Sequence, residues 1–113
     1  MLVLKYEMDL QDFEREFRDE LKDLSFDGVE IVFNSLCEMM FESNHSVMDV
    51  RDYLRFQMRV SSLDEVINDY RIDTEDQEDD EVIATVENYL NYNTYVLGMY
   101  EEDDTTYFIF DEF

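Results

Sequence analysis

The chain has 113 residues, with 31 acids against 8 bases and a formal net charge of −23. Phosphate groups would repel this charge, which argues against direct binding of nucleic acid and against contact with an anionic membrane surface. Disordered acidic chains are poor in apolar residues, whereas this one is 45% hydrophobic with nine Phe and eight Tyr, so we expect one folded acidic domain over residues 1–113.

The N-terminal half predicts a short strand followed by three helices. Residues 2–8, LVLKYEM, alternate as a short strand does, with Leu2, Leu4 and Tyr6 on one side. Apolar residues then recur every three or four positions, which predicts helices over residues 9–24 and 28–43. Ser46 is a plausible N-cap for a third helix that continues to residue 59.

The C-terminal half changes from helical to strand periodicity. Ser62 and Glu65 have the spacing of a capping box, which predicts a short fourth helix. An acidic loop follows, and then a fifth helix over residues 80–92. The tail TYVLGMYEEDDTTYFIFDEF predicts two strands around an acidic turn at residues 101–104, and the strand at residues 2–8 would join them. The expected fold is α+β: a mostly helical single domain with a small antiparallel sheet that includes a C-terminal hairpin.

Candidate catalytic groups are scarce. Cys37 and His45 are the only thiol and the only imidazole, and nucleophilic catalysis would need them close together with a third orienting group. Cys37 falls near the apolar face of its helix, while His45 sits in an expected turn. The carboxylates are too numerous for any pair to stand out as a general acid and base. We therefore expect no enzymatic activity.

Metal and cofactor motifs are equally scarce. A calcium loop of the EF-hand type needs glycine at its sixth position, where the run that starts at Asp73 has Glu78. The chain has too few zinc ligands and no glycine-rich phosphate loop. We expect neither a metal site nor a cofactor.

Sequence features also bear on the compartment. A single cysteine excludes an internal disulfide and fits a reducing cytoplasm. The first residues, MLVLKYEMDL, lack the basic start and long apolar run of a signal peptide. No stretch approaches the roughly 20 apolar residues that cross a bilayer. The expectation is a cytoplasmic protein, in the host cytoplasm if a phage encodes it.

Arg51, Arg55 and Arg59 would form one stripe on a helix, at positions i, i+4 and i+8. They could pair with Asp49, Asp52 or the acidic loop. They could instead clamp an acidic segment of this chain or of a second subunit.

Five tyrosines lie among the carboxylates of the C-terminal half. Tyrosine is enriched at interfaces because it combines apolar area with a hydroxyl group. Together with the high aromatic content, they predict a homodimer built on apolar and tyrosine surface. These residues are Tyr89, Tyr92, Tyr95, Tyr100 and Tyr107.

Negative charge is concentrated towards the C-terminus. Residues 1–71 hold 17 acids and all 8 bases, net −9, whereas residues 72–113 hold 14 acids and no base, net −14. Unpaired acids can bind a partner protein that supplies the bases. We therefore expect two runs of acids to bind a basic partner. The loop run is Asp73, Glu75, Asp76, Glu78, Asp79, Asp80 and Glu81, and the hairpin run is Glu101, Glu102, Asp103 and Asp104.

Such charge can imitate DNA. B-DNA carries one negative charge per roughly 1.7 Å of axis, and acids at i and i+4 on a helix lie about 6 Å apart, close to the spacing of successive phosphates. Glu16 with Glu20, and Glu38 with Glu42, have this spacing. The pattern predicts an inhibitor that occupies the DNA-binding groove of a basic protein.

The segment NYLNYNTY, residues 88–95, and the acidic strand-like end after it resemble the closing segment of ArdA antirestriction proteins. The resemblance covers roughly the last quarter of the chain. ArdA proteins are acidic, dimeric DNA mimics that block type I restriction enzymes, so the resemblance implies an antirestriction activity. Anti-CRISPR proteins of phages and mobile elements share this composition.

Other functions would use the same charge. An immunity protein or antitoxin would neutralise one basic nuclease. A secretion-type chaperone, itself a small acidic α/β dimer, would hold an unfolded basic segment in an apolar groove. Salt adaptation ranks last, because halophilic chains usually reduce large exposed apolar residues and this chain is rich in Phe and Tyr.

Overall fold

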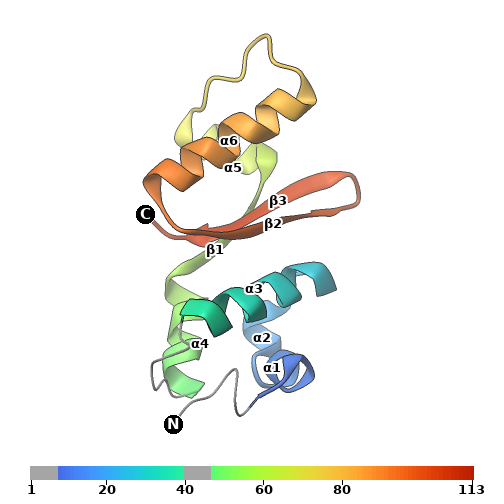
Figure 1. Ribbon diagram of the computed structural model, residues 1–113, viewed down its shortest axis with the longest axis vertical. Helices are drawn as coiled ribbons and strands as arrows, with labels where there is room; N and C mark the ends of the chain where they lie inside the picture. Colours follow the sequence, from blue (N-terminus) through green and yellow to red (C-terminus); the bar gives the residue numbers. More distant parts are fainter. Residues whose placement is uncertain (1–7, 40–46) are drawn as a thin grey trace. The chain divides into compact units, whose positions relative to one another are not determined.

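The computed structural model describes residues 8–39 and 47–113 (Figure 1). The chain divides into two compact units, which we call the N-terminal unit (Met1–Met58) and the C-terminal unit (Arg59–Phe113). Helices and a three-stranded sheet make up the described residues, so the α+β class with a small antiparallel sheet is confirmed. One domain over the whole chain stays a prediction.

The N-terminal unit is helical in its described part. Its helices are α1 (Leu10–Glu16), α2 (Arg18–Leu21), α3 (Phe26–Met39) and α4 (Val47–Phe56). The single helix expected over residues 9–24 is interrupted at Phe17, whose backbone dihedrals of −108° and 28° are not helical. Of the predicted strand at residues 2–8, only Met8 is described, and it is not in a strand. The predicted break at Asn44 and His45 lies outside the described residues.

Local capping explains where two of these helices begin. The Asp9 carboxylate accepts a hydrogen bond from the Asp12 backbone N–H at 2.8 Å and so satisfies one free donor of the first turn of α1. The Ser25 hydroxyl accepts one from the Gly28 N–H at 3.2 Å, beside the start of α3. Helix α3 therefore begins slightly earlier than residue 28.

The apolar stripe predicted for the first helix lies in the core. Phe13 and Phe17 are fully buried, and Leu21 is nearly so. The ring of Phe13 lies 5.1 Å from that of Phe17 and 5.2 Å from that of Phe33 on α3. The contact between Phe13 and Phe33 joins α1 to α3, and Phe17, at the interruption, packs against the same Phe13 ring.

The predicted third helix is wrong at its C-terminal end. Helix α4 ends at Phe56, and residues 58 and 59 belong to strand β1 (Met58–Ser62). Strand β1 lies beside β3, which comes much later in the chain. The three-arginine stripe consequently does not exist, because Arg59 is on a strand.

The C-terminal unit packs two helices on one face of the sheet. Its elements are α5 (Leu63–Tyr70), α6 (Asp79–Asn93), β2 (Val96–Glu102) and β3 (Thr105–Asp111). Among the residues that the structure describes, the strand order is β1-β3-β2, so β2 is at one edge of the described sheet. The core consists of Val66 from α5, two residues from α6 and two from β3, all fully buried: Val66, Val86, Leu90, Phe108 and Phe110.

The predicted capping box fixes the start of α5. The Glu65 backbone N–H donates to the Ser62 hydroxyl at 3.2 Å, and the Ser62 backbone N–H donates to the Glu65 carboxylate at 2.9 Å. The hydrogen bond from the Ser62 backbone, and then that from its side chain, lower the pKa of Glu65 below its ordinary value.

The predicted C-terminal hairpin is confirmed, with a tighter turn than expected. Strands β2 and β3 pair antiparallel, and Glu102 lies opposite Thr105, so only Asp103 and Asp104 form the turn. Both turn residues have positive φ, 53° and 64°. A type I′ turn requires this, and Asp tolerates it better than most residues. Glu101 and Glu102 lie in β2, where strand alternation sends them to opposite faces.

Candidate partner interface in the C-terminal unit

All eleven predicted partner-binding acids are exposed. In the loop run, Asp73, Glu75 and Asp76 lie between α5 and α6, and Glu78 is the N-cap residue of α6. Residues 79–81 form the first turn of α6, where the positive end of the helix dipole favours negative charge.

Hydrogen bonds shape the loop that carries the loop run. The Asp73 carboxylate accepts from the Glu75 N–H at 3.1 Å, and the Gln77 N–H donates to the Thr74 carbonyl at 3.3 Å. The Thr85 hydroxyl donates to the Gln77 side-chain oxygen at 3.0 Å, which ties the loop to α6. The loop therefore has its own internal hydrogen bonds and an anchor on the following helix.

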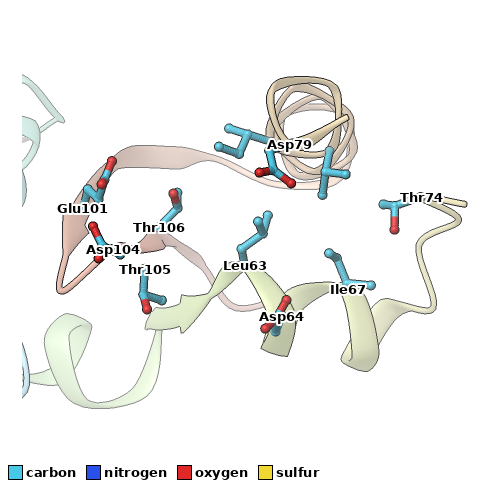
Figure 2. Close-up of a pocket in the computed structure, with 11 residues that line it drawn as sticks. Leu63, Asp64, Ile67, Thr74, Asp79, Glu101, Asp104, Thr105 and Thr106 are labelled. Carbon is cyan, nitrogen blue, oxygen red and sulfur yellow. The ribbon is translucent and has the colours of Figure 1, made fainter. Parts of the chain in front are cut away.

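The two runs meet at one pocket of about 560 Å³ (Figure 2). Asp79 of the loop run lines it, together with Glu101 and Asp104 of the hairpin run. Asp64, from the first turn of α5, is a fourth carboxylate at this pocket. Sequence reasoning missed Asp64 because it stands apart from both runs in the chain.

Aliphatic side chains and threonines make up the rest of the pocket lining. Leu63 and Ile67 come from α5, and Figure 2 shows both side chains directed towards α6. Val82 and Ile83 of α6 complete an aliphatic floor, and all four side chains are half-buried. The hydroxyl-bearing residues of the lining are Thr74, Thr105 and Thr106.

The C-terminal unit has little positive charge to offset these acids. Between Arg59 and Phe113 there are 17 acids and two bases. One base, Arg71, is exposed at the C-cap of α5, and we find no ion pair for it within residues 8–39 and 47–113. Over those same residues, neither run takes part in a salt bridge.

The other base, Arg59, acts at the far end of the sheet. It pairs with Asp69 and lies 3.9 Å from the Glu112 carboxylate. Its guanidinium donates to the Tyr70 hydroxyl at 3.1 Å and lies 5.8 Å from the centre of the Phe110 ring. Burial raises the pKa of Tyr70 above its ordinary value.

The length of β3 separates that arginine from the hairpin run. Strand β3 has seven residues, which at about 3.3 Å each span roughly 20 Å. Arg59 contacts the end of β3, and the hairpin run lies at its beginning. At this separation the arginine charge is largely screened from the hairpin run at physiological salt.

The other two arginines of the predicted stripe bind acids of the N-terminal unit. Arg51 pairs with Glu20 and with Glu16, the latter at 3.3 Å, and Arg55 lies 3.6 Å from Glu20. Arg51 and Arg55 therefore clamp an acidic segment of this same chain, as the second interpretation of the arginine stripe predicted.

This clamp corrects one predicted pair of phosphate-like acids. The side chain of Glu20 is only 3% exposed and is neutralised by two arginines, so it cannot present charge to a partner. Glu16 is the last residue of α1 and Glu20 lies in α2, so the pair does not share one helix. In the second pair, Glu38 is exposed and Glu42 lies outside the described residues.

No family model, curated protein or solved structure matches the chain. The resemblance of residues 88–95 to ArdA proteins stays a prediction. The structure places most of this segment on α6, where Tyr92 is 90% exposed.

Only two of the five tyrosines are exposed to solvent. Tyr92 and Tyr95 are exposed, whereas Tyr100 is buried and stacks on Tyr107 with the rings 5.2 Å apart. Tyr89 contacts the ring of Tyr70 at 5.7 Å. A tyrosine-based homodimer stays a prediction, with Tyr92 and Tyr95 as its most accessible members.

Other chemistry has little support in the described part of the chain. Cys37 is half-buried on α3, and His45 lies outside that part. Within it, no group of three or more His, Cys, Asp or Glu side chains is placed to hold a metal ion. Among its helices, none has the length and apolar character needed to cross a membrane.

Proposed function

We propose that this protein is an acidic DNA mimic that inhibits a basic DNA-binding protein by occupying its DNA-binding groove. The inhibitor is of the phage or mobile-element type, as antirestriction and anti-CRISPR proteins are. The observation that carries this proposal is the meeting of two exposed acidic runs at one pocket, in a unit with 17 acids and two bases. It acts in the host cytoplasm by occupancy alone, without catalysis, metal or cofactor.

Electrostatics supply the mechanism. A basic groove that binds phosphates attracts the two runs over distances comparable to the Debye length, about 10 Å at 0.1 M salt, and this speeds the encounter. The affinity is spread over many carboxylates, so single substitutions have small effects. Apolar contacts then select the partner, since charge alone does not distinguish one basic groove from another.

An immunity protein or antitoxin against a basic nuclease is the second candidate. The pocket favours it, because an apolar floor beside the acids suits the recognition of one cognate protein. The two candidates differ in what they displace. A DNA mimic always competes with DNA, whereas an immunity protein can also inhibit from a neighbouring surface.

A competition experiment tests the proposal. The partner is first isolated from host lysate at low and high salt and identified by mass spectrometry. Binding of labelled duplex DNA to that partner is then measured with increasing amounts of this protein across a salt series. We expect mutual displacement that weakens as salt rises. If DNA and this protein bind the partner together with no loss of affinity, the mimicry proposal fails.

A further inference from the structure

We propose that the pocket of the C-terminal unit receives a long basic side chain, arginine or lysine, from the target protein. Its aliphatic stem lies on the floor and its charged end reaches the carboxylates. This deepens the proposed function and rests on it, because it names what the target inserts between the two acidic runs.

The floor of the pocket suits an aliphatic stem. Leu63, Ile67 and Ile83 pack against the buried core of the C-terminal unit, which holds them in place while leaving each partly exposed. Long basic side chains bury their methylene groups on apolar surface and keep the charged head outside. DNA mimicry by charge alone has no use for such a floor, so the floor points to a side chain that penetrates between the acids.

The acids of the pocket suit the charged head. Asp79, Glu101 and Asp104 come from three different elements, namely α6, β2 and the hairpin turn. Carboxylates accept charge-assisted hydrogen bonds from guanidinium or ammonium groups, and threonine hydroxyls accept further ones. Within residues 8–39 and 47–113 these three acids are in no ion pair, so their counter-charge has to come from a partner.

The size of the pocket agrees with this occupant. Its volume of about 560 Å³ lies within the usual range of ligand pockets, roughly 300–1,000 Å³. That is room for a long side chain together with the backbone that carries it.

Two triple variants with the same change in charge distinguish binding in the pocket from general electrostatic attraction to the acidic surface. The pocket variant is Asp79→Asn, Glu101→Gln and Asp104→Asn. Its matched control neutralises neighbouring or equivalent acids that do not line the pocket: Asp80→Asn, Glu102→Gln and Asp76→Asn. Asp80 is beside Asp79 on α6, Glu102 is beside Glu101 on β2, and Asp76 has the same positive φ as Asp104, 64°.

The probe is a hexa-arginine peptide, compared with a peptide of equal charge whose guanidinium groups sit on stems two methylenes shorter. We expect the pocket variant to bind hexa-arginine about tenfold more weakly than its control does, the sum of several surface ion pairs. We also expect the short-stem peptide to bind the unaltered protein more weakly than hexa-arginine. The proposal is overturned if the two variants bind hexa-arginine equally well and the unaltered protein binds both peptides equally well.

Methyl NMR locates the peptide on the protein. Hexa-arginine should shift the methyl signals of Leu63, Ile67, Val82 and Ile83 in a saturable way, and the short-stem peptide should shift them less. Binding that leaves these methyl signals unmoved would also overturn the proposal. Methyl shifts caused by spermine but not by hexa-arginine would overturn it as well, because the occupant of the pocket would then be a polyamine.

Failure of the pocket and failure of the mimicry give different results. If the pocket alone is wrong, the two variants weaken equally in the DNA competition assay with the target. If the mimicry is wrong, the unaltered protein does not displace DNA at all, whatever the peptides do.

Discussion

Replacing Glu20 with glutamine tests whether this acid is structural. Glu20 is 3% exposed and paired with Arg51 and Arg55, whose side chains are 21% and 52% exposed. Removing one partner of a fully buried ion pair costs about 3–5 kcal/mol. Both arginines keep access to water, so we expect Glu20→Gln to lower the free energy of unfolding by about 2 kcal/mol. This corresponds to a fall in Tm of about 10 °C for a domain of this size.

The assay is urea and thermal unfolding followed by circular dichroism, with two comparison variants. Glu16→Gln should cost less than about 1 kcal/mol, because its side chain is 44% exposed and surface pairs contribute little. Asp23→Asn, at an exposed position just after α2, should cost nothing measurable. All three variants should bind the target equally well at a temperature where each is folded.

Two results would refute this reasoning. One is a Glu20→Gln protein as stable as the Asp23→Asn protein, which would mean that the clamp contributes nothing. The other is a folded Glu20→Gln protein that binds the target much more weakly than the Glu16→Gln protein, which would restore Glu20 as a mimic of phosphate. Adding Arg51→Met to Glu20→Gln should recover part of the lost stability, because no partly buried arginine then remains with one of its two carboxylates missing.

Five further predictions concern other parts of the molecule. Neutralising the whole loop run to Asn and Gln should weaken target binding strongly and flatten its dependence on salt, measured as log K against log salt concentration; an unchanged slope would contradict it. Ser62→Ala should cost about 1 kcal/mol in urea unfolding, because it removes half of the capping box. The lowered pKa of Glu65 makes its stabilisation present above the pKa of the unfolded chain and lost as pH falls through the folded one, so Glu65→Gln should reduce the fall in stability in that acid range. Asp103→Asn with Asp104→Gly should stabilise the hairpin by about 1 kcal/mol in thermal unfolding, because these residues favour positive φ, and a loss of stability would argue against the type I′ turn. Light scattering at micromolar concentration and moderate salt should find a dimer, and a monomer there would count against the tyrosine surface.

Sequence reasoning succeeded where the cause of a structure is local. The capping box of Ser62 and Glu65 is set by contacts three residues apart, and the hairpin by alternation on both sides of a short turn. The strand at residues 58 and 59 was missed because its cause is distant: β1 lies beside β3, and this outweighs the helical spacing of the arginines. The interruption at Phe17 was missed because the apolar stripe continues across it.

Part of the candidate site could be predicted in the same way. The two acidic runs are visible in the sequence because no base lies near them. Their meeting at one pocket depends on how α5 and α6 pack over the sheet, which no spacing in the chain records. The burial of Glu20 depends likewise on α4, more than 30 residues later in the chain.

The position of β2 at the edge of the sheet has a consequence before any partner arrives. An edge strand can pair with the strands of other molecules, and β2 also exposes Met99. Glu101 and Glu102 give it like charges that repel a second copy, and the register shift between Val96 and Gly98 disturbs the regular pairing surface. In a crowded cell, the negative charge of Glu101 and Glu102 therefore protects this strand from aggregation.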